Sequence, residues 1–220
     1  MPLIKLPNYA HSQKDAILNN FIIKFIETMS KLVFATANQN KVNEIQKIMG
    51  AQYDFLSLED IGCTEDIPET QPTIVGNALQ KARYVYEKYG MNCFAEDTGL
   101  QIHALDGAPG VYSARYAGPA RDANNNMDKV LTELGDTDNR AAQFKTVIAL
   151  ILDGKEYTFE GIVEGYILKE RQGTGGFGYD PIFRPRESDR TFAEMSSDEK
   201  GKISHRGRAT EKLRKFLLSL

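Results

Sequence analysis

Residues 142–168, AQFKTVIALIL-DG-KEYTFEGIVEGYIL, contain the pattern that decides the fold class. Side chains alternate between polar and apolar at the start of residues 142–152, and residues 157–168 form a second extended run. Such a period of two is typical of a strand. Asp153-Gly154 lies between the runs, and Asp-Gly is a strong signal for a tight hairpin turn. The stretch therefore predicts two long antiparallel strands.

Shorter strands and helices are predicted on both sides of this hairpin. We expect strands at residues 32–36, 53–58 and 92–96, and helices at residues 42–49, 73–89, 122–134, 196 onward and 206–218. Ser196 and Glu199 fit a capping box, and Ser204 is the expected N-cap of the last helix. Because helices and strands alternate first and paired strands follow, we predict an α/β fold with a mixed sheet.

The composition favours a globular protein and excludes some function classes. The chain has 220 residues, 41% of them hydrophobic, and a formal net charge of −3. This charge argues against a nucleic-acid coat or a polybasic membrane anchor. No apolar run approaches the roughly 18 residues of a membrane span, and the N-terminus lacks a secretory pattern, so we expect a cytoplasmic protein. Cys63 and Cys93 lack metal-ligand spacing and are expected to be small buried hydrophobes.

Residues 1–28 differ from the rest of the chain. Apolar side chains recur at helical spacing between residues 15 and 28, and a buried-strand pattern follows from residue 32. We therefore expect an N-terminal extension over 1–28, which carries an amphipathic helix, and a separate domain over 29–220. The alternative is a helix that docks its apolar face on the domain or on a partner.

Two segments combine groups that suit phosphate and metal ions. Residues 36–41, TANQNK, link a predicted strand to a predicted helix, where free backbone N–H groups and a lysine form an anion site. Residues 96–99, EDTG, place adjacent carboxylates at the expected end of a strand, which suits Mg²⁺ and a water molecule. Each segment alone is also compatible with an ordinary turn.

Two later segments suit a flat ring and an anion. Residues 173–181, GTGGFGYDP, contain the dinucleotide-binding pattern of glycines, but prolines follow where that motif needs a helix. Phe177 or Tyr179 could instead stack on a base. Lys200, Lys202 and residues 204–208, SHRGR, supply cations for phosphate oxygens or a base carbonyl. Taken together, the four segments favour phosphate-anhydride chemistry on a nucleotide bound with Mg²⁺.

The four segments, together with residues 107–116 (GAPGVYSARY), resemble the inosine/xanthosine triphosphate pyrophosphatase family. The motifs follow the family's order from residue 29 to the C-terminus. The resemblance implies an α/β fold with a long central mixed sheet and two lobes around an active-site cleft. It also implies a homodimer and Mg²⁺-dependent hydrolysis of ITP, dITP and XTP to the monophosphate and pyrophosphate.

The resemblance also implies roles for individual residues. Asp97 would be the general base and a metal ligand, and Glu69 the second ligand, with Glu65 and Asp66 as competitors. Many family members have Glu-Asn-Ala where this chain has residues 76–78, GNA, so any metal role there is in doubt. The expected contacts at the phosphates are Thr36, Ala37, Asn38, Gln39, Asn40 and Lys41, with Lys200 also reaching them and Thr98 nearby. Phe177, Gly178, Tyr179 and Asp180 would hold the base, with Phe177 stacking on it, and His205 and Arg206 would read the purine edge.

Other functions remain open on the sequence. A related pyrophosphatase could act on modified pyrimidine or methylated guanine triphosphates. A regulator could bind nucleotides without turnover, although Lys41, Asp97 and Thr98 argue against it. A nucleic-acid-binding module is disfavoured by the net charge.

Overall fold

The computed structural model describes residues 32–50 and 55–220. The helix predicted before residue 29 lies outside these residues. The strands are β1 (Val33–Phe34), β2 (Cys93–Ile102), β3 (Pro109–Gly110), β4 (Ala141–Leu152), β5 (Lys155–Ile167) and β6 (Phe183–Pro185). They form one sheet in the order β1-β2-β4-β5-β6, with β3 beside β2. Only the pair β1–β2 is parallel among the described residues, so the predicted mixed sheet is confirmed.

The hairpin that decides the fold is formed as predicted. β4 and β5 pair along their full length, from Ala141 opposite Tyr166 to Leu152 opposite Lys155. Asp153 and Gly154 have φ angles of 49° and 77°. Two residues with positive φ match the twist of the flanking strands, which explains why Asp-Gly is favoured there.

The helices are α2 (Gln39–Met49), α3 (Ile74–Tyr89), α4 (Ala123–Leu134), α5 (Ser197–Ile203) and α6 (His205–Leu218). The capping box of Ser196 and Glu199 is confirmed, and the Ser204 side chain accepts from Gly207 N at the start of α6. α2 begins earlier than expected because the Asn38 side chain accepts from Asn40 N and Lys41 N. Single 3₁₀ turns occur at His103–Leu105, Ser113–Arg115, Asp180–Ile182 and Phe192–Glu194.

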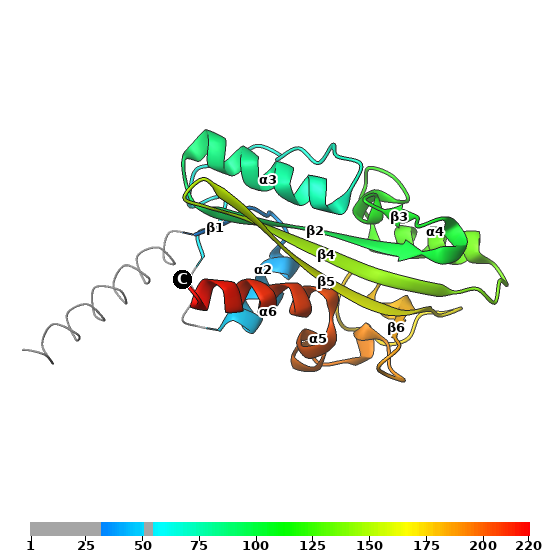
Figure 1. Cartoon of the computed structure of the whole chain (residues 1–220). Coiled ribbons are helices and arrows are strands. Elements are labelled where there is room, and N and C mark those ends of the chain that lie inside the picture. Colours follow the sequence, from blue (N-terminus) through cyan, green and yellow to red (C-terminus); the bar gives the residue numbers. More distant parts are fainter. Residues whose placement is uncertain (1–31, 51–54) are drawn as a thin grey trace, which may run out of the picture.

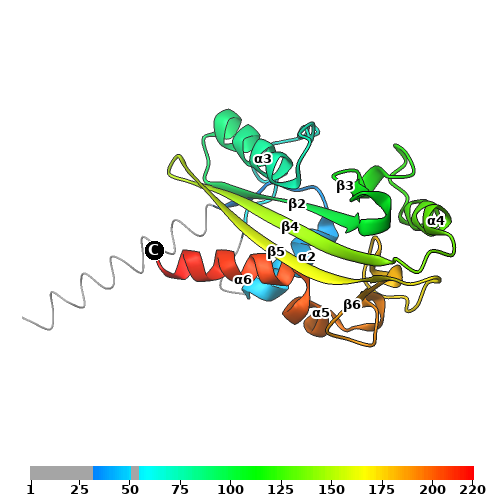
Figure 2. The same cartoon turned by 45° about the vertical axis from the view of Figure 1, so that its right-hand side comes forward.

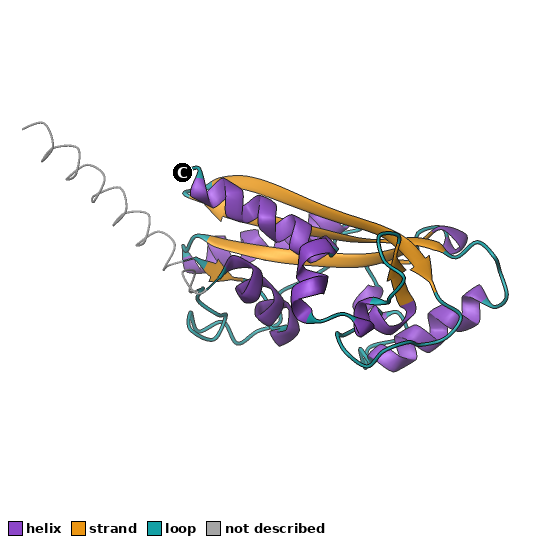
Figure 3. Cartoon of the chain, turned by 90° about the horizontal axis from the view of Figure 1, so that it is seen from below, coloured by secondary structure: helices purple, strands orange, loops and turns teal. Residues whose placement is uncertain are grey.

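The helices cover both faces of the sheet. α3 lies on one face, and α2 and α6 lie on the other, as Figures 1 and 2 show. The view from below, in Figure 3, shows α6 running along the strands. Alternation sorts the side chains of the first strand region: Leu32 and Phe34 pack with α2 and α6, whereas Val33 and Ala35 pack with α3. The same rule places neighbouring residues of β2 on different faces.

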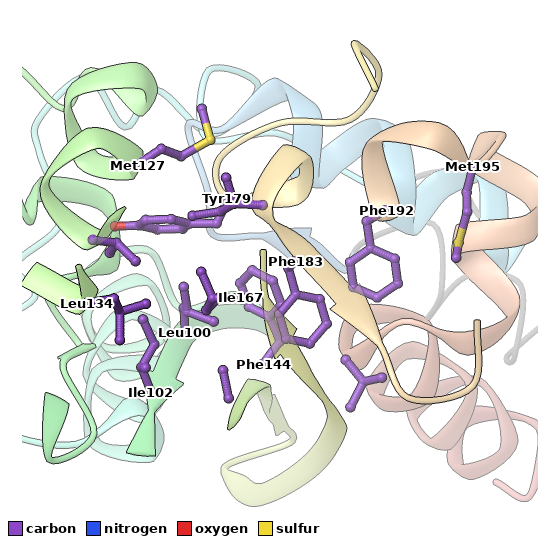
Figure 4. Packing of buried hydrophobic residues seen from close by; sticks show 14 residues of the cluster. Leu100, Ile102, Met127, Leu134, Phe144, Ile167, Tyr179, Phe183, Phe192 and Met195 are labelled. Atoms are coloured by element: carbon purple, nitrogen blue, oxygen red, sulfur yellow. The ribbon is translucent and has the colours of Figure 1, made fainter. Parts of the chain in front are cut away.

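A third hydrophobic cluster fills the other end of the sheet. Phe144 of β4 packs edge-on against Phe183 of β6, with ring centroids 4.7 Å apart (Figure 4). Tyr179 and Phe192 join this cluster from the segments around β6, and Met127 joins it from α4. The glycine-rich loop before Tyr179 is therefore attached to a packed core.

Two strand predictions need correction. β2 was expected to end at Glu96 but continues to Ile102, because Leu100 and Ile102 are buried and pair with β4. Glu96 and Asp97 thus lie within a strand, just beyond the end of the parallel strand β1. The strand predicted over 53–58 is reduced to a single bridge between Leu56 and Val33, although residues 51–54 lie outside the description.

In the part of the chain that the structure describes, no helix combines the length and apolar character needed to cross a membrane.

Candidate active site

Glu96 and Asp97 point to opposite faces of β2. Glu96 faces α6, where its carboxylate accepts from Arg206 Nε (2.7 Å) and Nη2 (2.8 Å). Burial alone would raise the pKa of Glu96, but the charges of Arg206 and Lys41 hold it well below its usual range. Glu96 is therefore an ionised carboxylate committed to a buried ion pair.

Asp97 faces α3 and has one oxygen to spare. Lys81 Nζ lies 3.3 Å from Asp97 Oδ1 and also contacts the carboxylate of Glu69. Asp97 Oδ2 is buried and makes no hydrogen bond within the described residues. Burial raises the pKa of Asp97, against the opposing charges of Lys81 and Lys41. A buried carboxylate with a raised pKa and an unpartnered oxygen suits a metal ligand or a proton acceptor.

The acidic groups fit Mg²⁺ only as a partial ligand set. No group of three or more His, Cys, Asp or Glu side chains in residues 32–50 and 55–220 is arranged to hold a metal. Asp97 and Glu69 face each other across Lys81. Because Mg²⁺ is commonly held by one or two carboxylates together with water and substrate phosphates, this pair fits such an ion.

Glu65, Asp66 and Glu69 are the three candidates for the second metal ligand. All three line the same cavity. Glu65 Oε1 already accepts from Tyr84 (2.9 Å), from Tyr89 (2.8 Å) and from Lys88. Glu69 is joined to Asp97 through Lys81, so Glu69 is the best candidate for the second ligand.

The loop before α2 places backbone N–H groups and Lys41 at the cavity. Thr36 Oγ1 accepts from Asn38 N (3.2 Å), and Lys41 Nζ lies 3.4 Å from the Glu96 carboxylate. Gln39 points away from the cavity, and its side chain donates to Asn43 Oδ1 (2.8 Å). Five of the six predicted contacts in this loop line the cavity: Thr36, Ala37, Asn38, Asn40 and Lys41.

The glycine-rich loop contributes another part of the cavity wall. Phe177, Gly178, Tyr179 and Asp180 line the cavity. Tyr179 is fixed in place, because its hydroxyl donates to Ser113 O (2.8 Å) and its ring packs in the hydrophobic cluster around Phe144 and Phe183. Phe177 is the freer aromatic, and its ring lies under the cations of Lys200 and Arg206, at 4.8 and 5.3 Å.

Lys200 and Arg206 are fixed by carboxylates. Lys200 lies behind the cavity wall, with Nζ 2.6 Å from Asp180 Oδ2 and 2.7 Å from Glu44 Oε1. Arg206 contacts Glu44 and Glu96, and its Nη2 lies 3.4 Å from Thr98 Oγ1. The guanidinium therefore has few donors left for a ligand.

His205 is a buried neutral side chain at the same wall. Its ring stacks on Phe144 with centroids 4.4 Å apart. Burial and the nearby charges of Arg206 and Lys200 lower the pKa of His205 well below its usual value. Its Nδ1 makes no hydrogen bond within the described residues, so it can serve a polar ligand.

These walls enclose one cavity of about 570 Å³, lined from the loop before α2, the loop before α3, β2 and the start of α6. Lys41, Lys81, Asp97, Phe177 and His205 all line this cavity. Such a volume is within the range of small-molecule sites.

Comparisons with known proteins show the family of this chain. A model of the Ham1 family matches residues 32–216. The dITP/XTP pyrophosphatase of Flavobacterium psychrophilum is 57% identical over 186 residues, which cover 84% of this chain and 98% of that protein. The chain belongs to the Ham1 family. The family resemblance inferred from the motifs is confirmed.

More distant Ham1 relatives support the same assignment. The dITP/XTP pyrophosphatase of Bacillus subtilis is 47% identical over 193 residues, 86% of this chain and 98% of that protein. A HAM1 protein from Coxiella burnetii has a solved structure with a TM-score of 0.80 and 39% identity, covering 86% of this chain and 98% of that one. The fold and the family thus agree over the same part of the chain.

Sequence reasoning missed some charged groups that line this cavity. Lys81 lies on the buried face of α3 together with Asn77, Ala78, Ala82 and Val85. A lysine at helical spacing among apolar residues was an available signal, because buried lysines need a partner. Arg115 also lines the cavity and lies 3.8 Å from Glu69 Oε2. Its position gave no comparable signal.

Proposed function

We propose that this Ham1 family member is a Mg²⁺-dependent dITP/XTP pyrophosphatase that removes ITP, dITP and XTP from the nucleotide pool. The carrying observation is the 57% identity to a protein of that name over 84% of the chain. The cavity supports the proposal, because Asp97 offers an unpartnered oxygen beside Lys81 and Glu69.

The phosphates are proposed to lie at the start of α2. The Lys41 ammonium and the backbone N–H groups of Ala37 and Gln39 would bind phosphate oxygens. The N–H groups of Asn38, Asn40 and Lys41 already donate to Thr36 Oγ1 and Asn38 Oδ1. Asp97 and Glu69 would hold Mg²⁺, which when bound neutralises the charge that develops on the phosphates. Gln39 would act only through its backbone, since its side chain bonds to Asn43.

Asp97 is the proposed general base. It would orient a water molecule for in-line attack and accept its proton as the bond from water oxygen to the α-phosphorus forms. The bond from the α-phosphorus to the bridging oxygen breaks, and its electron pair leaves with pyrophosphate. Lys81 would hold Asp97 in place, with Thr98 close by on the other face of β2.

The base is proposed to lie between Phe177 and the start of α6. Phe177 would stack on the purine, while His205 and the remaining donors of Arg206 would bind the O6 acceptor. Asp180 and Lys200 would keep this wall in place through their ion pair. Adenine presents an amino donor at the same position and would leave a buried donor unpaired, at a cost of about 1–3 kcal/mol.

The remaining expectations stay part of the proposal. They are a homodimer, a cytoplasmic location, a catalytic domain over residues 29–220 and two lobes that close around the cleft. The rival functions are a pyrophosphatase for modified pyrimidine or methylated guanine triphosphates and a nucleotide-binding protein without turnover.

One assay separates these functions. Pyrophosphate release would be measured with Mg²⁺ on ITP, dITP, XTP, GTP, ATP and dTTP, and on methylated GTP. We expect release from the first three, loss of activity with a chelator and recovery with Mg²⁺. No release from ITP, dITP or XTP would refute the proposal.

Asp97→Asn tests the proposed base. The amide keeps the size of the side chain but cannot accept the proton from water, so turnover should fall by roughly a thousandfold or more. Circular dichroism and thermal unfolding would show whether the variant is folded. Retained turnover in a folded variant would remove Asp97 from this role.

A further inference from the structure

The loop that carries Glu69 is fastened to α3 at both ends. On the N-terminal side, Glu65 contacts Tyr84, Lys88 and Tyr89 of α3. On the C-terminal side, Thr70 N donates to Gln80 Oε1 (2.9 Å), and Gln80 Nε2 donates back to Thr70 Oγ1 (2.9 Å). Gln71 N donates to Asn77 Oδ1 (2.8 Å). Glu69 lies between these two attachments.

The attachment at Glu65 is unusually dense. A single oxygen, Oε1, accepts from two tyrosine hydroxyls and one ammonium, all from the last two turns of the same helix. Lys88 Nζ also lies 5.5 Å from the ring of Tyr84 and 5.6 Å from the ring of Tyr89. The donors therefore contact one another and form a preassembled receptor for one carboxylate.

Glu69 needs such support. Its own segment has no helix or strand, and its carboxylate faces the like charge of Asp97 across Lys81. A loop that is free to move away would have to be ordered again each time a metal binds, and that ordering opposes binding. A loop already fastened to α3 avoids this cost.

We propose that Glu65 is a positioning residue that holds Glu69 opposite Asp97 and thereby sets the affinity of the metal site. This proposal rests on the proposed function for the identity of the metal ion. Glu65 acts through the loop, since its Oε1 is already committed to three donors of α3. Groups outside the direct ligand set commonly change metal affinity by about 10- to 100-fold.

Two variants break the attachment in different ways. Glu65→Gln removes the charged acceptor, whereas the double variant Tyr84→Phe/Tyr89→Phe removes two donors and leaves the carboxylate in place. Glu156→Gln is the matched control. Glu156 of β5 forms an ion pair at 2.7 Å with Arg83 of α3, the helix to which the loop is attached, and Glu156 lies outside the loop.

Two readouts do not depend on turnover. Amide hydrogen exchange of residues 66–72 would be followed without metal, and the dissociation constant of Mn²⁺ would be measured by electron paramagnetic resonance. We expect both attachment variants to exchange faster over residues 66–72 than the wild type and to bind Mn²⁺ roughly tenfold more weakly. The control should match the wild type in both readouts. At saturating Mg²⁺, kcat of both attachment variants should stay within about twofold of the wild-type value.

The outcomes distinguish this proposal from its alternatives. Wild-type protection and wild-type Mn²⁺ binding in Glu65→Gln would overturn it. Weak binding in Glu65→Gln with normal binding in the tyrosine variant would identify Glu65 as a direct ligand and also overturn it. If the wild type released no pyrophosphate while both variants loosened the loop and weakened Mn²⁺ binding, the proposed function would fail and the positioning role would stand.

Discussion

Glu96 and Asp97 differ in role because consecutive residues of a strand face opposite sides of the sheet. Glu96 is fully buried and is bound through both oxygens by Arg206. Among the described residues, one oxygen of Asp97 contacts Lys81 and the other has no hydrogen-bond partner. The two adjacent residues therefore differ: Glu96 is held in an ion pair, and Asp97 keeps one oxygen for the proposed chemistry.

Replacing Lys81 by methionine should change the pH dependence of turnover. Burial raises the pKa of Asp97, and the positive charge of Lys81 opposes that rise. Without this charge the pKa rises further, so Asp97 is protonated at a higher pH. The acidic limb of kcat/KM, scaled to each variant's own maximum, should therefore move to higher pH. Lys47→Met, at an exposed pair with Asp198, is the control. An unmoved limb in Lys81→Met would contradict the assigned role.

Replacing Glu96 by glutamine should destabilise the fold. The change leaves the buried charge of Arg206 with only Glu44 as a charged partner. Breaking a buried pair costs about 3–5 kcal/mol, and we expect about 3 kcal/mol because Glu44 remains. Urea unfolding would measure it, with Glu164→Gln at the exposed pair with Arg186 as a control expected below about 1 kcal/mol.

The same variant has a defined pH signature. The folded pKa of Glu96 lies well below its unfolded value, so its contribution is fully present above about pH 4.3 and is lost as pH falls below it. The stability difference between wild type and Glu96→Gln should therefore be constant from about pH 8 to 5 and shrink only in acid. A difference that already fades near neutral pH would contradict this assignment.

Residue identity in the site was only partly readable from the sequence. A carboxylate pair beside a threonine and a glycine predicts a site for metal and water, whereas the choice of Asp97 within that pair came from the family resemblance. Lys81 and Glu44 were missed, since their roles arise from contacts with residues 12 to 162 positions away. Pairings over such separations depend on how the sheet brings segments together.

At the scale of elements, α5 and α6 meet closely where the site begins. A Cβ added at Gly207 would lie 1.9 Å from Gly201 O, whereas one added at Gly201 would lie 3.6 Å from Ile48 Cγ1. Gly207 directly follows His205 and Arg206 at the start of α6. The close approach of the two helices thus fixes where both side chains enter the cavity.

Gly207→Ala should therefore damage stability and activity together. Overpacking against a backbone oxygen costs about 1–3 kcal/mol and would displace the start of α6. Gly201→Ala is the matched control and should be neutral or stabilising by up to about 1 kcal/mol, since alanine is favoured within helices. Thermal unfolding and kcat/KM on the same samples would check both. Equal behaviour of the two variants would contradict the helix contact.

Elements were predictable where their signals are local. The caps at Ser196 and Ser204 and the Asp153-Gly154 turn involve neighbours in sequence, and all three were found. The extension of β2 beyond Glu96 was missed because it depends on pairing with β4, from Thr98 opposite Thr146 to Ile102 opposite Ala142. Gly99 made the sequence favour a strand end at this point, since glycine commonly marks a strand end or a bulge.

At the scale of the whole molecule, charged side chains from distant parts of the chain meet in ion pairs. The C-terminal quarter supplies Lys200 and Arg206, and the earlier part of the chain supplies Glu44 and Glu96 as their partners. Ion pairs thus join distant segments behind the cavity. Much of the charge that suggested a nucleotide site is used to hold the cavity wall together.

Residues 1–28 lie outside the family match, which begins at residue 32. Deleting them should leave pyrophosphate release and oligomeric state unchanged, because every cavity residue described here follows residue 34. A second deletion, of residues 1–34, removes Leu32 and both residues of β1, Val33 and Phe34. All three side chains are at most 3% exposed. Losing three buried side chains and the only parallel strand of the described sheet should unfold the chain, at about 1.5–3 kcal/mol for each side chain. Assays, light scattering and thermal unfolding of both deletions would locate the boundary of the domain. A large loss of activity or of assembly in the shorter deletion would show that the N-terminal segment docks on the domain or on a second copy.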